Sequence, residues 1–166
     1  MQRARVRPAT EHDLPVILEL IRELAIYERE PDAVEATVED LRRDGFGEQP
    51  RFHVALAEDG GAAVGFALYF FTYSTWQGRP GLHLEDLFVR PSHRGRGLGK
   101  ALLVELARVA VRRGCGRYQW QVLDWNAPAI DFYERLGARR LGEWLNMRVS
   151  GEALAAHAAE PTVVDA

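Results

Sequence analysis

The chain lacks several features that would place it in a specialised class of protein. A single cysteine, Cys115, excludes an internal disulfide framework and suits a reducing compartment. No run of about 18 apolar residues occurs, so we expect no membrane-spanning helix. No apolar stretch follows the polar start Met1 to Arg5, so we expect no signal peptide and a cytoplasmic location.

The charge is also close to balanced, with 21 Lys and Arg residues against 24 Asp and Glu residues and a formal net charge of −3. Nucleic-acid-binding domains usually carry a basic face, so we expect no nucleic-acid partner. Mild acidity suits a cationic small molecule better. The five histidines show no metal-ligand spacing, so we expect no metal site.

Hydrophobic periodicity predicts one α/β domain over residues 1–150, followed by a surface tail or short helix over 151–166. Gly45 is expected to end the second helix in a left-handed conformation. The order of elements implies one mixed sheet with helices on its faces. Strands are predicted at 4–7, 52–57, 64–72, 82–89, 118–123 and 141–149, and helices at 11–27, 37–45, 98–114 and 126–137.

A glycine-rich turn lies between the strand 82–89 and the helix that begins at Leu98. Its sequence is Arg94-Gly95-Arg96-Gly97-Leu98-Gly99-Lys100. Glycine lets backbone N–H groups approach a ligand without obstruction, and the positive end of the helix dipole lies at the same place. Two arginines add positive charge. The turn therefore predicts an anion site, for which a pyrophosphate is the natural ligand.

Three kinds of phosphate-binding turn compete for this segment. A nucleotide-triphosphate loop needs Ser or Thr after Gly-Lys to hold Mg²⁺, but Ala101 stands there. A dinucleotide fingerprint needs G-x-G-x-x-G and an acid about 20 residues later, where this chain has Tyr118 and Gln119. The third form, Arg/Gln-x-x-Gly-x-Gly/Ala, fits Arg94 to Gly99. A surface turn without a ligand is the remaining alternative.

The third form resembles the acetyl-CoA pyrophosphate loop of the GNAT superfamily of N-acetyltransferases, and Val89-Arg90-Pro91 is similar to the same superfamily. Further blocks resemble the diamine (spermidine/spermine) N1-acetyltransferase family, with its thialysine acetyltransferase relatives. These blocks are Arg7–Thr10, Glu23–Glu28, Asp44–Glu48, Tyr69–Tyr73, Glu85–Val89, Trp125–Tyr133 and Leu136–Ala138. The similarity fades near Trp144, and the loop after Ala57 is shorter than is usual in the family.

The resemblance implies a mostly antiparallel GNAT-like sheet flanked by helices on both faces, and a homodimer. It also implies acetyl transfer from acetyl-CoA to an amine. Backbone N–H groups from Arg94 to Lys100 would bind the pyrophosphate. A bulge or splay beside Leu87, Phe88 and Val89 would expose backbone groups to the pantetheine arm, and Asn126, Ala127, Pro128 and Ala129 would line its other side.

Tyr133 is the candidate general acid. A departing CoA thiolate needs a proton, which a phenol held beside the sulfur can donate. Spacing alone leaves a buried structural tyrosine as an equal alternative, because Tyr133 shares a helix face with Ile130 and Gly137. The Asn-x-x-Ala-x-x-Phe-Tyr context resembles the family's catalytic tyrosine and favours the functional role.

The acceptor amine must lose a proton before it can attack. A primary amine with a pKa near 10.4 is about 0.1% neutral at pH 7.4. Glu85 is an unexpected acid in the middle of a strand, and the resemblance implies that it contacts the amine and that either this carboxylate or a chain of water molecules relays the proton. Strand alternation directs Asp86 to the opposite face, which makes it a structural partner. An exposed charge is the alternative for Glu85.

Tyr27 and Glu28, at the end of the first helix, are candidates for the remote part of the amine site. A second carboxylate suits a substrate with two positive charges, although solvated helix-end residues are a common alternative. Gln119 and Gln121 share a strand face and could donate hydrogen bonds to the substrate, and Trp120 between them completes the candidate substrate set.

These observations leave more than one function open. The leading expectation is an acetyl-CoA-dependent N-acetyltransferase that acts on a diamine or polyamine. A thialysine or other amino-acid N-acetyltransferase is the alternative within the family. A non-catalytic acetyl-CoA-binding module and a nicotinamide-dependent reductase are alternatives from other classes.

Overall fold

The computed structural model describes residues 4–162 of the chain. The chain divides between Gln121 and Val122 into two compact units. Within the described residues, no helix has the length and apolar character that crossing a membrane requires. The last four residues of the expected C-terminal tail, 163–166, lie outside this range.

The first unit is built on one five-stranded sheet in the order β1-β2-β3-β4-β5. Neighbouring strands are antiparallel except β4 and β5, which are parallel because the helix α3, Leu98–Arg112, crosses between them. The expected mostly antiparallel mixed sheet is thus confirmed. The strands are β1 Arg5–Pro8, β2 His53–Asp59, β3 Ala62–Ser74, β4 Arg79–Val89 and β5 Arg117–Trp120.

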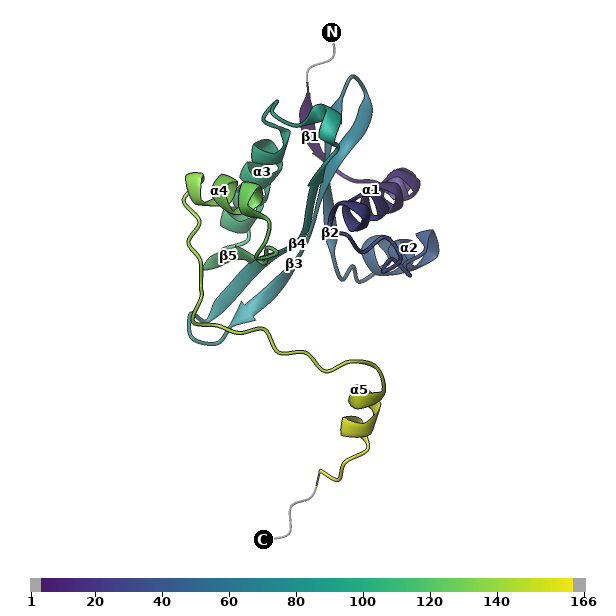
Figure 1. Cartoon of the computed structure of the whole chain (residues 1–166), viewed down its shortest axis with the longest axis vertical. Coiled ribbons are helices and arrows are strands. Elements are labelled where there is room, and N and C mark those ends of the chain that lie inside the picture. The colour runs from purple at the N-terminus through teal and green to yellow at the C-terminus, as the bar shows by residue number, and fades with distance from the viewer. Residues whose placement is uncertain (1–3, 163–166) are drawn as a thin grey trace. The chain divides into compact units, whose positions relative to one another are not determined.

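Helices cover both faces of this sheet, as expected (Figure 1). The helices α1, Leu14–Tyr27, and α2, Val38–Phe46, lie on one face, and α3 lies on the other. Short 3₁₀ helices at Glu11–Asp13 and Pro91–His93 precede α1 and the glycine turn. The core beneath α1 and α2 is apolar and almost fully buried: Leu14, Ile17, Leu18, Leu20, Leu24, Leu41, Val54, Leu56, Phe66, Leu68 and Phe88.

An ion-pair cluster fixes α1 against the end of β4. The Arg90 guanidinium donates to Glu23 at 2.7 Å and to Glu19 at 2.6 Å, and the Arg90 backbone N–H donates to the Val64 carbonyl at 2.9 Å. The pair with Glu23 is largely screened from solvent, so it contributes more than an exposed pair of the same length. Arg90 therefore holds the carboxyl end of β4 against the helix whose last turn carries Tyr27.

A two-residue hairpin joins β2 to β3. Gly60 and Gly61 have φ angles of 61° and 86°, and Asp59 pairs with Ala62 across the turn. Two consecutive positive φ values define the tight turn that matches the twist of an antiparallel hairpin, and glycine adopts them without strain. The turn places Asp59 at the tip of the hairpin.

Gly45 does not have the conformation that the sequence predicts. It lies inside α2, which ends at Phe46, and Gly47 after it has an ordinary φ of −75°. A Cβ atom built on Gly45 would lie 2.5 Å from the ring of Phe52. Gly45 is therefore required by close packing of the helix on Phe52 and not by a left-handed helix end.

The second unit contains α4, Ala127–Arg135, and α5, Gly151–Ala158, and no strand among its described residues. The prediction of a strand over 141–149 is wrong, because nothing in the described part of the chain pairs with this segment. Its alternating apolar residues are instead exposed, with Leu145 84% and Met147 90% accessible. The alternating pattern is real, but a strand also needs a neighbouring strand with which its backbone can form hydrogen bonds.

Candidate active site

The glycine turn leads from the end of β4 into α3. Gly95 and Gly97 have φ angles of 72° and 82°, a region that residues with a Cβ rarely adopt. Between Arg94 and Ala101 no backbone N–H group donates to another backbone group within the described residues. A Cβ built on Gly95 or Gly97 would have nothing within 4 Å. The turn therefore presents a row of bare N–H groups at the positive end of a helix.

The two arginine side chains of the turn are engaged in contacts with the protein. The Arg94 Nε donates to the Val89 carbonyl at 2.8 Å, and the Arg94 guanidinium lies 4.6 Å from the centre of the Tyr27 ring. The Arg96 guanidinium forms an ion pair with Asp59. Both side chains add positive charge, as expected, but they also fasten the turn to the rest of the unit.

The edge of β4 opens beside the turn. Pairing between β4 and β5 ends at Leu84 and Trp120, so residues 85–89 have β3 on one side and no strand of the described chain on the other. The backbone groups of this edge, at Leu87 to Val89, are the ones that the family resemblance assigned to the pantetheine arm. The separation of β4 from β5 that the resemblance implied is present, and the turn follows the end of β4.

A β-bulge lies at Glu85. Leu68 of β3 faces Asp86, whereas the next residue, Tyr69, faces Leu84, so Glu85 is the extra residue of β4. A bulge interrupts the alternation of side chains along a strand. The prediction that Asp86 points away from the site is therefore wrong.

Asp86 shares a sheet face with Leu68 and Phe88, the face that α1 covers. The Glu85 carboxylate also reaches this face, where it lies 3.5 Å from the His83 imidazole. Burial, together with the negative charges of Glu85 and Glu28, raises the pKa of Asp86 to about 7. Three carboxyl groups thus gather where β4 meets the end of α1.

The end of α1 contributes Tyr27 and Glu28 to the same region. Glu28 follows the last helical residue at the surface, and partial desolvation raises the pKa of its carboxyl group. The Tyr27 ring stacks on the guanidinium of Arg94, which is the first residue of the glycine turn. The structure therefore places Glu28 near enough to Asp86 for their charges to interact, and it links Tyr27 to the turn through Arg94.

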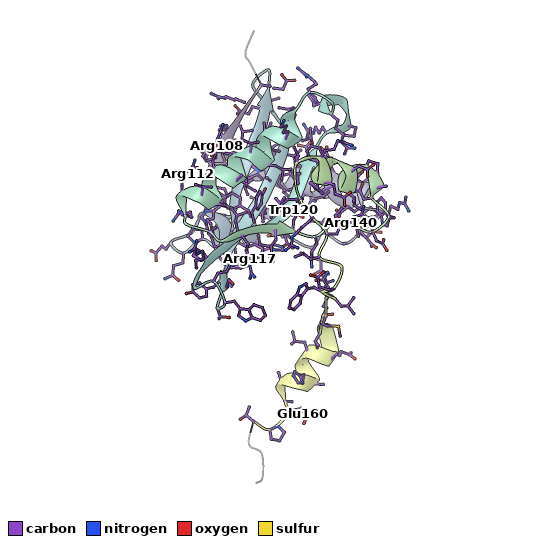
Figure 2. All side chains as sticks on the ribbon, turned by 90° about the vertical axis from the view of Figure 1, so that its left-hand side faces the viewer. Arg108, Arg112, Arg117, Trp120, Arg140 and Glu160 are labelled. Atoms are coloured by element: carbon purple, nitrogen blue, oxygen red, sulfur yellow. The ribbon has the colours of Figure 1, made fainter. Side chains whose placement is uncertain are left out.

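Figure 2 labels Arg117 and Trp120 at the two ends of β5. Gln119 pairs with His83 and therefore shares the face of Asp86. Trp120 pairs with Leu84 on the opposite face, where its ring lies 5.0 Å from that of Tyr118. Gln121 follows the strand and is exposed. Of this expected set, only Gln119 is placed with the carboxylates.

The second unit holds the remaining expected site residues on and before α4. Asn126 caps this helix, its side-chain oxygen accepting from the Ala129 N–H at 3.4 Å, and Pro128 stands in the first turn. Tyr133 lies two turns farther along, half-buried, with its ring 5.4 Å from that of Phe132. Ala127 and Ala129 complete the first turn. The predicted cap and helix are confirmed.

The comparisons with known proteins agree with this geometry. The sequence matches the Acetyltransferase (GNAT) family over residues 15–138. It is 46% identical over 160 residues to the thialysine N-epsilon-acetyltransferase of Sus scrofa, a match that covers 90% of this chain and 94% of the relative. The chain belongs to the GNAT family.

Other members of the family show the same relationship. The chain is 39% identical over 160 residues to the spermidine/spermine N(1)-acetyltransferase-like protein 1 of Homo sapiens, which covers 90% of this chain and 23% of that longer protein. The fold is similar to an integron cassette protein from the mobile metagenome of V. cholerae, with a TM-score of 0.81, 26% identity, and coverage of 96% and 100% of the two chains.

Family membership and the close curated relatives identify the chain as an N-acetyltransferase. GNAT proteins use acetyl-CoA, so the nucleotide-triphosphate and dinucleotide alternatives for the turn are set aside. The reductase and the non-catalytic module are set aside with them. Within residues 4–162, no group of three or more His, Cys, Asp or Glu residues is arranged to hold a metal ion.

Two residues near the glycine turn and the β4 edge have positions that the sequence does not reveal. Asp86 was assigned to the wrong face because the bulge beside it is invisible to a rule of strict alternation. No pattern in the sequence marks Asp59, although its carboxylate binds an arginine of the glycine turn 37 residues away. The one signal in the sequence that points to the bulge is the pair of consecutive acids, Glu85 and Asp86, in an otherwise apolar strand.

Replacing Asp86 by Asn tests the buried carboxyl group. The pKa of Asp86 rises from 3.8 to about 7 on folding, so the folded protein keeps a proton that the unfolded chain has released, and this contribution to stability is lost as the pH rises toward 7. Asn carries no charge at any pH. We therefore expect the melting temperature of D86N, relative to the unchanged protein, to be higher at pH 8.5 than at pH 5 by several degrees.

The matched control is D32N, which removes an exposed carboxylate. Its melting temperature, measured by calorimetry at both pH values, should follow that of the unchanged protein. If the difference in melting temperature between D86N and the unchanged protein were the same at pH 5 and pH 8.5, the raised pKa of Asp86 would be contradicted.

Proposed function

We propose that this enzyme transfers an acetyl group from acetyl-CoA to the terminal amine of a small cationic molecule bound between β4 and the end of α1. The observation that carries the proposal is the turn from Gly95 to Lys100, whose backbone N–H groups donate to no backbone carbonyl of the described residues and which leads into the start of α3. Such N–H groups bind a pyrophosphate without needing a cationic side chain.

The donor would extend from this turn along the open edge of β4. Leu87, Phe88 and Val89 would offer backbone hydrogen bonds to the pantetheine arm, because the pairing of β4 with β5 ends at Leu84. A backbone N–H here would also polarise the thioester carbonyl as negative charge develops on its oxygen. Asn126 to Ala129, at the start of α4, would line the other side of the arm.

The acceptor would lie among Glu28, Glu85 and Asp86. Three carboxyl groups suit a molecule with two ammonium groups, which both a diamino acid and a polyamine possess. We propose a lysine-like ω-amino acid such as thialysine as the main acceptor, because the curated relative with 46% identity carries that name. The Arg94 guanidinium beside Tyr27 would pair with the carboxylate that such a substrate brings.

Polyamines are the second candidate. The chain is 39% identical to a spermidine/spermine N(1)-acetyltransferase-like protein, and the pKa of Glu28 is raised by desolvation. A carboxyl group whose charge is poorly solvated gains when an ammonium group binds beside it. Glu28 is therefore suited to the distal ammonium group of a long dication.

Proton transfer would begin at the acceptor ammonium group. Asp86, whose pKa of about 7 matches neutral conditions, would take the proton, directly or through water and Glu85. The neutral amine nitrogen then attacks the thioester carbonyl carbon, a C–N bond forms, and the C–S bond breaks. Tyr133 would donate its phenolic proton to the departing thiolate and recover one, directly or through water, from the positively charged nitrogen that the attack creates, which leaves the neutral amide.

The role of Tyr133 is tested by replacing it with Phe. Without the phenolic proton, kcat should fall by about 10²-fold or more, while the KM for acetyl-CoA changes less than about threefold. Release of free CoA thiol measures the rate. Y73F, which alters an exposed tyrosine of β3, is the control and should leave kcat unchanged. A Y133F enzyme with normal kcat would remove Tyr133 from the proton transfer.

The acceptor is tested with a panel that includes thialysine, lysine, ornithine, spermidine and putrescine. We expect the highest kcat/KM for thialysine. Glu28→Gln should lower kcat/KM for spermidine about tenfold, since the distal ammonium group loses its partner, and change that for thialysine less than threefold. Glu30→Gln, an exposed neighbour, is the control. Equal losses for both substrates would mean that Glu28 does not distinguish them.

We also propose that the enzyme is a homodimer in the cytoplasm, with no nucleic-acid or membrane partner. The segment 141–149 exposes Leu141, Trp144, Leu145, Met147 and Val149, and its alternating pattern suits a strand that lacks a neighbour. A second copy could supply that neighbour. The single Cys115 is compatible with a reducing compartment.

Light scattering tests the dimer. The measured mass should be twice the 18.7 kDa of one chain. Replacing Leu145 by Glu should shift the equilibrium toward monomers by placing charge in an apolar interface. V111E, at a position 80% exposed on α3, is the control and should leave the dimer intact. A monomeric mass for the unchanged protein would refute the proposal.

A further inference from the structure

The tip of the β2–β3 hairpin is tied to the glycine turn by one ion pair. Asp59 is the last residue of β2, and its carboxylate binds the guanidinium of Arg96, in the middle of the turn. The Asp59 side chain is only 16% exposed, and His93 lies 3.9 Å away from the same carboxylate. The hairpin and the turn are 37 residues apart in the sequence, so this pair is a tertiary contact.

The turn has little else to hold its centre. Gly95 and Gly97 flank Arg96, both have positive φ, and no atom lies where their side chains would be. Glycine loses more backbone freedom on ordering than any other residue. The Arg94 side chain fastens the start of the turn, and α3 fastens its end. The Asp59–Arg96 pair is the contact that reaches the segment between them.

We propose that Asp59 is a positioning residue for acetyl-CoA, which acts through Arg96 by holding the turn in the conformation that presents its N–H groups to the pyrophosphate. This inference rests on the proposed function, in which the turn binds acetyl-CoA. In this proposal Asp59 acts only through its ion pair with Arg96 and not by direct contact with the cofactor. It raises cofactor affinity because the backbone is already ordered when the pyrophosphate arrives.

A direct role of Arg96 in binding phosphate predicts the opposite result for Asp59. If the Arg96 charge bound the cofactor, Asp59 would compete for it, and its removal would strengthen binding. If Arg96 is an anchor, removal of Asp59 weakens binding although the site becomes more positive. The sign of the change therefore separates the two roles.

The experiment measures binding of CoA by calorimetry and steady-state kinetics with acetyl-CoA for the full chain, D59N and R96Q. Each variant should raise Kd and KM about 5- to 20-fold, the factor for ordering about one further residue on binding. The kcat value should change less than twofold, because the reacting groups are untouched. Glu48→Gln removes an exposed carboxylate outside the ion pairs of the described residues and should change neither constant.

The double variant D59N/R96Q tests whether Asp59 and Arg96 affect CoA binding through their contact with each other. If Asp59 acts through Arg96, the double variant should bind CoA no more weakly than either single variant. The effect should persist with 3′-dephospho-CoA, which keeps the pyrophosphate, and vanish with pantetheine, which lacks it. R96Q also keeps the result interpretable if D59N folds poorly.

Tighter or unchanged CoA binding by D59N, additive effects in the double variant, or an effect that disappears with 3′-dephospho-CoA would each overturn the inference. These outcomes are distinct from failure of the proposed function, in which the unchanged protein itself would bind no CoA. If the unchanged protein binds CoA and D59N binds it equally well, acetyl-CoA binding stands and only the role of Asp59 falls.

Discussion

The end of hydrogen bonding between β4 and β5 is the constraint on which the site depends. Up to Leu84 the two strands are a regular parallel pair, and beyond it β4 continues with one edge open. The chain must still return to β5, and it does so through the glycine turn and α3. One departure from regular pairing thus places an open backbone edge, a helix start and a row of bare N–H groups at the same end of one strand.

The bulge at Glu85 lies at the start of this open edge and changes the face on which Asp86 lies. An extra residue in β4 brings Asp86 onto the face covered by α1, where desolvation and the nearby Glu28 disfavour its charge. A buried acid without a cationic partner weakens a fold, and such groups occur where chemistry needs them. Asp86 is thus an energetically unfavourable group beside the open edge of β4. The ion pairs of Arg90 with Glu19 and Glu23 stabilise the adjoining part of α1.

The elements and the glycine turn could be predicted because their signals are local: apolar periodicity, caps such as Asn126, and glycines next to a helix start. The site could be predicted only in part. Asp86 and Asp59 take their roles from strand register and from a contact between distant segments, and neither leaves a local pattern. Gly45 resembles a helix end in sequence, but packing on Phe52 decides its place. The exposed segment 141–149 has the pattern of a strand and no partner within the described chain.

The hairpin turn at Gly60 and Gly61 has a consequence for how this enzyme could diversify. Because the turn has only two residues, the position of Asp59 is determined by the pairing of β2 with β3. Any insertion there would change where the carboxylate lies, yet the turn is remote in sequence from Glu28, Glu85 and Asp86. If the glycine turn binds the donor as proposed, a change in the length of this surface hairpin would alter the affinity for the donor and leave these three carboxyl groups unchanged.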